Sequence, residues 1–314
     1  MSSIHAQTPG LLTTVQDLGR EGFGAMGVSP SGAAERVSLR IGNRLVGNDE
    51  GAPALEMTLL GGTFAFPQGA VFALTGSDFG ATLNDAPLQL WTSYEARPGR
   101  VLRAGPTQSG ARCYLCVHGG IRVEPFLGSA STHLLSGLGG HQGRALRKGD
   151  VLEIGPASEP FRKTSVSAEM LRHLSPRKIL RVTPGPQQDW FSESAYRIFS
   201  SNSYRVAEES NRMGLRLASQ PIDGDFAGEM ISEGVSLGAV QITAAGLPII
   251  LFVEQQTTGG YAKIANVISA DFHSLGQLRP RDEIRFEPVD WESARSLLLE
   301  QEDLLACKDL FIRS

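Results

Sequence analysis

The sequence lacks long hydrophobic runs, has little cysteine and carries no excess of positive charge, and each shortage excludes a class of protein. Its apolar runs stop far short of the roughly 18 residues that a membrane-spanning helix needs. The N-terminal stretch MSSIHAQTPG has neither region of a signal peptide, so we expect a cytoplasmic location. Three cysteines are too few for a disulfide framework. A formal net charge of −4 argues against a nucleic-acid groove.

Signatures of nucleotide and metal sites are also missing. No Gly-Lys pair occurs, which excludes a P-loop, and GLGGHQG at 137–143 misses the dinucleotide fingerprint by one position. Cys113 and Cys116 lie three residues apart in a strand-like segment, so their side chains point to opposite faces and cannot readily share a metal. We therefore expect both cysteines to pack in the core, and we predict no metal site.

Glycine is abundant: 36 Gly and 17 Pro are spread along the chain. They separate short strand-like segments, such as GAVFALTG, RVLRAG and DVLEIG, at roughly the 8–12-residue spacing of sandwiches and barrels. Helical periodicity is limited to a few segments. One covers residues 33–46 with Ser31 at the position of a cap, and another covers 291–305 with Asp290 as cap and Trp291 on the buried side. The sequence therefore predicts a mainly β protein with few helices.

An internal echo suggests two related halves. Residues 145–155 read ALRKGDVLEIG and residues 277–287 read QLRPRDEIRFE, so both have the form L-R-x-x-D followed by a closing strand. Chance is the alternative, because turn-Asp-strand patterns are common. If the echo is real, it predicts two β lobes, residues 1–160 and residues 161–314 with the C-terminal helix, joined within the polar stretch 156–170.

A first polar constellation is TTVQDLGREGFGAMGVSPSGAAE, residues 13–35, which leads into the first predicted helix. A helix N-terminus with free N–H groups can receive an anion or a polarised carbonyl. The alternative to ligand binding is a structural role, in which these residues cap the helix and Asp17 pairs with Arg20 at the surface. The candidate substrate-binding residues here are Gln16, Arg20, Ser29 and Ser31, and Asp17 and Glu56 are candidates for a catalytic base or an orienting group.

Two further polar segments adjoin strand-like stretches: ESNRMGLRL at 209–217 and EQQTTGGYAKI at 254–264. Arg212 suits bidentate capture of a carboxylate, although a structural pair with an acidic residue such as Glu56 is the alternative. The second segment is either a tight turn or a ligand loop whose glycines admit close approach. We expect both segments to face one pocket. Their candidate binding residues are Asn211, Gln256, Thr257, Thr258, Gly259, Gly260 and Tyr261, with Arg212 as a candidate catalytic residue.

At these segments the chain resembles a known family. The stretches TTVQDLGREGFGAMGVSPSGAAE, SLRIGNRLVGN, PALEMTL, GSASTHLLSGLGGHQGRALRKGD, SNRMGLRL, SEGVSLGAVQ and QTTGGYAKIANVISADFHSLGQLRP are together similar to the KipA / allophanate hydrolase subunit 2 family. That family is also described as biotin-dependent carboxyltransferase-like and includes the C subunit of 5-oxoprolinase. Glu35 and Glu254 stand where the family more commonly has Asp, or Asp or Asn. The resemblance implies a mainly β fold of two cyclophilin-like β-barrel lobes with a few helices.

The resemblance also implies partners and an activity. A KipI-like B subunit and a LamB/YcsF-like A subunit would join this chain in an ATP-dependent 5-oxoprolinase, a hydrolase active only as a complex, that opens 5-oxoproline to glutamate. In that case ATP is used by the complex and the substrate is a small amide or lactam. Two alternatives remain. One is a carboxyltransferase-like module acting on urea or a related amide, for which a separate biotin carrier is needed because the chain has no Met-Lys attachment motif. The other is a KipA-type binder of a KipI-like kinase inhibitor.

Overall fold

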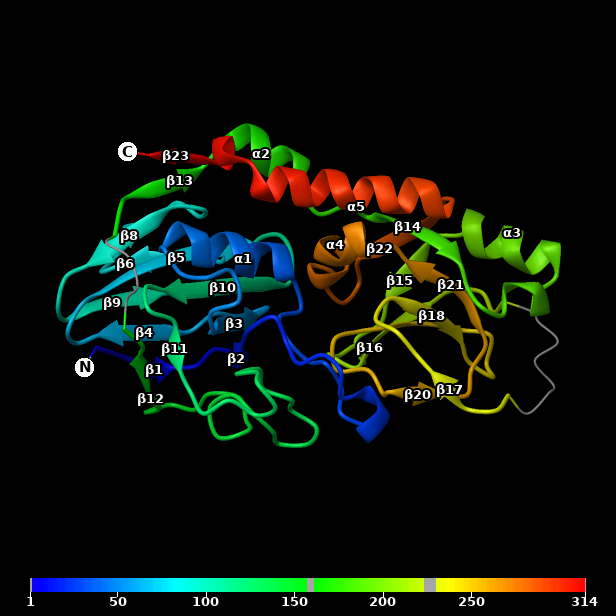
Figure 1. The fold of residues 1–314 in the computed structure, drawn as a ribbon, viewed down its shortest axis with the longest axis horizontal. Coiled ribbons are helices and arrows are strands. Elements are labelled where there is room, and N and C mark those ends of the chain that lie inside the picture. The colour runs from blue at the N-terminus through cyan, green and yellow to red at the C-terminus, as the bar shows by residue number, and fades with distance from the viewer. Residues whose placement is uncertain (1, 157–160, 223–229, 314) are drawn as a thin grey trace. The chain divides into compact units, whose positions relative to one another are not determined.

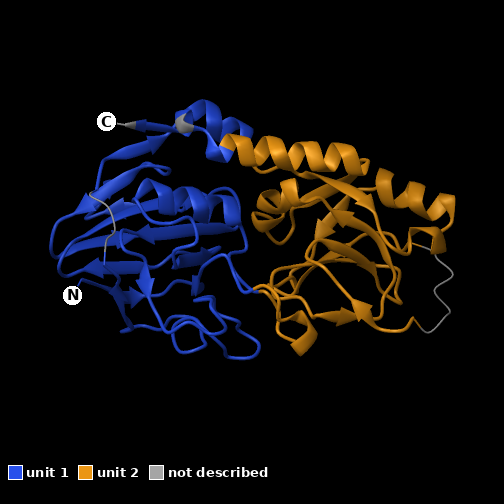
Figure 2. Cartoon of the chain, viewed as in Figure 1, with its two compact units in different colours: residues 1–20, 31–174, 305–314 blue, residues 21–30, 175–304 orange. Residues whose placement is uncertain are grey.

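The computed structural model describes residues 2–156, 161–222 and 230–313, and the chain folds into two compact units (Figure 1, Figure 2). Unit 1 comprises residues 1–20, 31–174 and 305–314, and unit 2 comprises residues 21–30 and 175–304. The boundary between units therefore lies at 174/175 rather than at 160/161, and both units are discontinuous in sequence. Of the polar connection expected at 156–170, residues 157–160 lie outside the described residues, and residues 161–170 belong to unit 1.

Unit 1 contains two antiparallel sheets. The first has the strand order β11 (Ile121–Arg122), β12 (Val151–Ile154), β1 (Ser3–Thr8), β4 (Thr63–Phe66), β9 (Arg100–Arg103), β6 (Thr82–Leu83) and β7 (Ala86–Pro87). The second has the order β2 (Leu12–Gln16), β3 (Ala54–Thr58), β10 (Arg112–Val117), β5 (Ala70–Gly76) and β8 (Ser93–Ala96). A short pair, β13 (Thr164–Val166) with β23 (Phe311–Arg313), joins two distant segments of the chain that belong to this unit.

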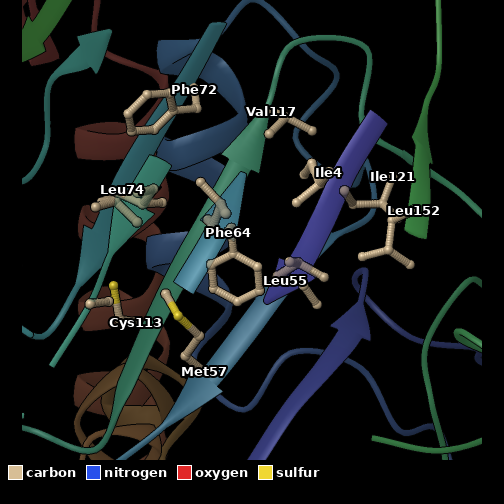
Figure 3. Close-up of a cluster of buried hydrophobic side chains, with 14 of the residues drawn as sticks. Ile4, Leu55, Met57, Phe64, Phe72, Leu74, Cys113, Val117, Ile121 and Leu152 are labelled. Atoms are coloured by element: carbon tan, nitrogen blue, oxygen red, sulfur yellow. The ribbon is translucent and has the colours of Figure 1, made fainter. Parts of the chain in front are cut away.

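The hydrophobic core of unit 1 is formed by side chains from both sheets (Figure 3). Ile4 and Phe64 come from the first sheet, whereas Leu55 and Leu74 come from the second, and all four are fully buried. Cys113 belongs to this cluster, but Cys116 belongs to the separate cluster that includes Leu39 and Ile41 of the first helix. The prediction that the two cysteines point to opposite faces and pack in the core is therefore confirmed.

Unit 2 is built around a closed barrel, which removes exposed sheet edges. Its strand order is β14 (Ile179–Pro184), β21 (Lys263–Val267), β18 (Ala239–Ile242), β19 (Pro248–Leu251), β16 (Gly214–Ala218), β15 (Tyr204–Val206) and β22 (Glu283–Pro288). The parallel pairing of β14 with β22 closes the ring. A separate two-stranded ribbon consists of β17 (Glu233–Gly234) and β20 (Thr258–Gly259). The mainly β fold with a barrel is thus confirmed, and in unit 1 the strands form two sheets.

The helices are short apart from the last. They are α1 (Arg36–Leu45), α2 (Ala168–His173), α3 (Glu193–Ser201), α4 (Phe272–Gly276) and α5 (Trp291–Ala306), with 3-10 turns η1 (Gly24–Met26), η2 (Gln188–Trp190), η3 (Ser269–Asp271) and η4 (Lys308–Leu310).

Two details of the helix predictions were wrong. Helix α1 begins at Arg36 with Glu35 as N-cap, not with Ser31, because Ser31 and Gly32 have left-handed φ values of 58° and 93° that turn the chain before the helix. Helix α5 begins as expected, since the Asp290 carboxylate accepts a 2.7 Å bond from Ser293 N. Trp291, however, is 62% exposed rather than buried.

The two segments of the internal echo form turns with the same hydrogen bond. The Asp150 carboxylate accepts a 2.7 Å bond from Arg147 N, and the Asp282 carboxylate accepts a 2.7 Å bond from Arg279 N. The residue before each Asp has positive φ, 92° at Gly149 and 72° at Arg281. Each turn leads into a strand, β12 in unit 1 and β22 in unit 2. The shared sequence pattern therefore encodes the same local hydrogen bonds in both units.

Candidate functional site

The Asp17 carboxylate holds two loops of unit 1 together. Its oxygens accept bonds from Gly19 N at 2.7 Å, Ala130 N at 2.6 Å and the Ser129 hydroxyl at 2.7 Å, and a further bond from Ser131. Asp17 is only 9% exposed. Four donors in a buried place favour a structural role for this carboxylate. The catalytic role expected from its polarity stays a prediction that none of these contacts supports.

Three other predicted binding residues of unit 1 contact the same loop, residues 126–132. Arg20 donates to Phe126 O and Ser131 O, and its guanidinium lies 5.5 Å from the centre of the Phe126 ring. Both Gln16 Nε2 and the Ser31 hydroxyl donate to Thr132 O, at 3.2 and 2.8 Å.

Burial distinguishes this arrangement from the expected surface pair, because Arg20 is 2% exposed and Asp17 is 9% exposed. The surface location was therefore wrong. Gln16 Oε1 is buried and has no hydrogen-bond partner among the residues that the structure describes. The cluster as a whole holds strand β2 and the chain after it against the loop of residues 126–132. This arrangement agrees with the structural alternative, in which these residues serve capping and loop packing.

Glu56 anchors the start of helix α1. Its Oε2 accepts bonds from Ala34 N at 2.8 Å and from the Tyr114 hydroxyl at 2.7 Å, and that hydroxyl accepts from Glu35 N at 2.8 Å. Burial, followed by the nearby carboxylates of Glu56 and Glu35, raises the pKa of Tyr114 well above its ordinary value, so the phenol keeps its proton. The N–H groups at this helix start thus bind protein atoms, which favours the capping alternative over anion binding.

Arg212 lies in unit 2 beside the start of the segment 254–264. Its Nε donates to the Glu254 carboxylate, and Glu254 N donates a 2.8 Å bond to Arg212 O. The two residues are 5% and 3% exposed. The two polar segments are therefore in contact at this point, and that they face one pocket stays a prediction. The acidic partner anticipated for a structural arginine is Glu254, and a buried pair of this kind is costly to break.

Two more predicted residues have identified contacts in unit 2. Asn211 is exposed, and its Oδ1 accepts from Met213 N at 2.8 Å, which is the bond of an Asx turn. Ser29 belongs to the part of the N-terminal motif that joins unit 2, where its hydroxyl donates to Val253 O at 3.2 Å. Ser29 thus contacts the chain next to Glu254.

The segment 254–264 forms part of the β17/β20 ribbon, in which Gly259 is the partner of Glu233. A Cβ at position 259 would lie 2.6 Å from Gln241 Nε2 and 3.0 Å from Gln256 Nε2, whereas a Cβ at Gly260 would meet nothing nearer than 3.6 Å. Gly259 is therefore the position of close approach. Gln256, Thr258, Gly260 and Tyr261 are exposed, and Thr257 is half-buried.

The structure adds residues beside this ribbon that were not predicted from the sequence. Lys263 on β21 is 3% exposed, and its Nζ lies 2.5 Å from Glu233 Oε1. Gln187 Nε2 donates to the same Glu233 oxygen at 2.8 Å, and Gln187 Oε1 accepts from Lys263 N at 3.2 Å. The bonds from Lys263 and then Gln187 hold the pKa of Glu233 below its ordinary value. Gln241, on β18, is the register partner of Lys263 and is 2% exposed.

A sequence signal for these residues existed. Lys263 and Gln241 interrupt the apolar strand segments KIANV and AVQI, and polar side chains within such strands are either exposed or buried with a reason. Nothing local decides between those outcomes.

Residues 234–238, GVSLG, have the form G-x-S-x-G, but they connect strand β17 to strand β18, whereas a nucleophile elbow connects a strand to a helix.

Metal clusters and membrane-spanning helices are both absent from the part of the chain that the structure describes. Within residues 2–156, 161–222 and 230–313, no group of three His, Cys, Asp or Glu side chains is placed to hold a metal ion. Over the same ranges, no helix has both the length and the apolar character needed to cross a membrane.

Comparison with known proteins identifies similar chains. Residues 26–288 match the family model "Carboxyltransferase domain, subdomain A and B". The chain is 39% identical over 295 residues to the C subunit of 5-oxoprolinase from Escherichia coli K12, covering 93% of each chain. It is 36% identical to the same subunit from Haemophilus influenzae, covering 92% of each. Among solved structures, the K. lactis urea amidolyase matches with a TM-score of 0.89 and 34% identity over 96% of this chain, which spans 20% of that protein.

Proposed function

The chain belongs to the family of carboxyltransferase domains, subdomains A and B, and on this premise we propose that it is the C subunit of a 5-oxoprolinase. One observation carries the proposal: two relatives named as this subunit match over more than nine-tenths of both lengths. The urea amidolyases, by contrast, contain a match to this chain as about a fifth of a much longer protein. The match therefore covers nearly all of the named C subunits but only a small part of the urea amidolyases.

As one component of a complex, the chain acts with partners. We propose a KipI-like B subunit and a LamB/YcsF-like A subunit, and ATP as a co-substrate of the cytoplasmic complex. The lactam of 5-oxoproline is a stable amide. Transfer of the terminal phosphoryl group of ATP to its carbonyl oxygen, with release of ADP, activates the carbon. One water adds there and the ring nitrogen leaves as the amine of glutamate, which gives an acyl phosphate that a second water hydrolyses to the carboxylate and phosphate. The contribution proposed for this chain is to bind and orient the lactam.

The test is reconstitution. The chain is co-expressed with a KipI-like and a LamB/YcsF-like protein from the same genome, and glutamate release from 5-oxoproline is measured with and without ATP. We expect ATP-dependent release by the three-protein mixture and none by any preparation that omits one protein. Robust turnover by this chain alone would contradict its assignment as one component of a complex, and a fully assembled complex that releases no glutamate would contradict the substrate.

The carboxyltransferase alternative rests on a specific observation, the 35% identity with the urea amidolyase of Saccharomyces cerevisiae over 96% of this chain. It predicts carboxyl transfer from a separate carboxybiotin carrier to urea or a related amide. Inhibition of the reconstituted activity by avidin would favour it, whereas glutamate release insensitive to avidin favours the oxoprolinase. A KipA-type regulator would bind a KipI-like protein tightly and show neither activity.

A further inference from the structure

A buried cation and a buried amide face each other on two strands of the unit 2 barrel. Lys263 on β21 and Gln241 on β18 are register partners, so their Cα atoms are separated by roughly 5 Å. The two residues are 3% and 2% exposed. An ammonium group and an amide that are both withdrawn from water form a concentrated source of hydrogen-bond donors. Such a pair suits an acceptor-rich or anionic ligand.

The Gln241 amide is the first sign that a ligand completes this arrangement. Its Nε2 is buried and has no hydrogen-bond partner among the described residues. Burying a donor without an acceptor is costly, so natural proteins seldom leave one unless water, an ion or a ligand binds there. Only a glycine fits beside this nitrogen at position 259, because a Cβ there would stand 2.6 Å from it.

The partner of Lys263 is the second sign. The side chain of Glu233 is 44% exposed and is held on a ribbon strand of two residues, Glu233–Gly234. The other buried cation near this segment, Arg212, has a partner, Glu254, that is 3% exposed. A carboxylate that keeps contact with water can leave its cation at a much lower cost than a fully buried one. Of the two carboxylates, Glu233 and Glu254, Glu233 is therefore the one that a ligand can replace beside its cation.

We propose that Lys263 and Gln241 form the receptor for a small carboxylate ligand, which displaces Glu233 from the Lys263 ammonium. The ammonium and the Gln241 amide donate to the incoming carboxylate, and the released Glu233 side chain, which is already 44% exposed, turns to water. The choice of 5-oxoproline as probe rests on the proposed function, because it is a small carboxylate with an adjacent lactam. The receptor itself is inferred from the barrel.

The test measures binding to the purified full-length chain by ligand-detected NMR and calorimetry, with 5-oxoproline and with 2-pyrrolidinone, the same lactam without a carboxylate. We expect 5-oxoproline to bind and 2-pyrrolidinone to bind on the order of tenfold more weakly or not at all. Lys263→Met and Gln241→Leu should each weaken binding of 5-oxoproline on the order of ten- to a hundredfold. Glu233→Gln should tighten it several-fold, because it removes the competing carboxylate. Glu208→Gln, which removes a charge from the exposed pair with Arg281 in the same unit, is the matched control and should change nothing.

A receptor predicts that Lys263→Met weakens binding of 5-oxoproline and that Glu233→Gln tightens it. A purely structural ion pair predicts that neither substitution changes the affinity. Absence of 5-oxoproline binding by the folded wild-type chain, or weaker binding by Glu233→Gln, would overturn the inference. The proposed function fails separately: a chain that binds 5-oxoproline through Lys263 in a complex that releases no glutamate keeps the receptor and loses the activity. A complex that turns over equally well with Lys263→Met loses the receptor and keeps the activity.

Discussion

Unit 1 and unit 2 both bury polar side chains beside glycine-containing segments, but they bind those side chains differently. In unit 1 the Asp17 carboxylate accepts from two backbone N–H groups and two hydroxyls, all contributed by its own turn and by one loop. In unit 2 the Lys263 ammonium is paired with a half-exposed carboxylate, and Gln241 Nε2 has no partner within the described residues. Burial of polar groups is thus common to both. What differs between these two places is how the charged group is held: the Asp17 carboxylate by four donors, and the Lys263 ammonium by a carboxylate that is 44% exposed.

The difference suggests how to separate structural from functional polar clusters in this fold. A polar group whose bonds are complete resists substitution for reasons of stability. One whose bonds are incomplete or exchangeable costs stability in the free protein and gains partners when a ligand binds. Substitution of Asp17 should therefore lower the free energy of unfolding. Substitution of Lys263 or Gln241 should mainly weaken ligand binding.

The largest expected effect is on the Arg212–Glu254 pair, which lies in unit 2 and has both partners buried. Arg212→Met leaves the Glu254 carboxylate buried without its cation, so the free energy of unfolding should fall by roughly 3–5 kcal/mol. Lys263→Met, with an exposed partner, should change it by less than about 1 kcal/mol. Urea denaturation followed by circular dichroism measures both. Equal losses for the two variants would remove the distinction between a fixed and an exchangeable pair.

Next in size is Asp17→Ala in unit 1. The change leaves Gly19 N and Ala130 N without their acceptor, so we expect the free energy of unfolding to fall by roughly 2–4 kcal/mol. Chemical denaturation gives this value, and Asp17→Asn, which keeps one acceptor oxygen, serves as the graded control with a smaller loss. If Asp17→Ala instead abolished activity of the reconstituted complex at unchanged stability, the catalytic role would be restored.

Asp150 provides a test by pH. Its carboxylate accepts two bonds from Arg144 at 2.7 and 3.0 Å, and this interaction with Arg144 is the main cause that lowers its pKa from 3.8 to about 2. A folded-state pKa below the unfolded value means that stability is present above about pH 4 and is lost as the pH falls toward about 2. The contribution is about 2 kcal/mol. Asp150→Asn should flatten this acid limb in denaturation curves measured between about pH 5 and 2, and an unchanged limb would assign it to other carboxylates.

The smallest effect is expected at the glycine pair of the ribbon. Gly259→Ala places a methyl group against the Gln241 and Gln256 amides and should weaken binding of 5-oxoproline by roughly tenfold, with the fold kept. Gly260→Ala brings its methyl group no nearer than 3.6 Å to another atom, an ordinary contact distance, and should be silent. Calorimetry on the two variants makes the comparison. If Gly260→Ala were the damaging change, the ligand would approach the exposed side of the loop rather than the Gln241 amide.

Much of the fold could be predicted because its signals are local. The Asp150 and Asp282 turns, the Asp290 cap and the opposite faces of Cys113 and Cys116 each depend on residues within three positions of one another. The predicted start of helix α1 was wrong because Ser31 turns the chain with positive φ, and the cap is Glu35, whose side chain accepts from Ser38 N. The contact that holds the chain just before the helix is not local, since Glu56 accepts from Ala34 N, 22 positions away. Trp291 was assigned to a buried stripe by periodicity alone, which cannot tell how much of a helix the rest of the protein covers.

The candidate site was predictable only in part, for the same reason. The proximity of Arg212 to the segment 254–264 followed from two polar segments placed at the ends of apolar strands. The partner of Arg212, however, was not identifiable, since Glu254 lies 42 positions away and Glu56 has the same charge. Lys263 and Gln241 escaped notice because a single polar residue in a strand is ordinary until its burial is known.

The sequence by itself determined that this protein is mainly β, where the Asp290 cap and the repeated Asp turn fall, and which family it resembles, because these depend on short-range backbone preferences and on ordered motifs. Only the tertiary structure decided which polar groups are neighbours. Asp17 meets Ser131 across 114 positions, and Gln187 meets Glu233 across 46. Hydrogen bonding and desolvation act over a few ångströms in space, whatever the separation along the chain. The roles of Asp17 as a structural acceptor and of Lys263 as an available cation follow from that spatial arrangement.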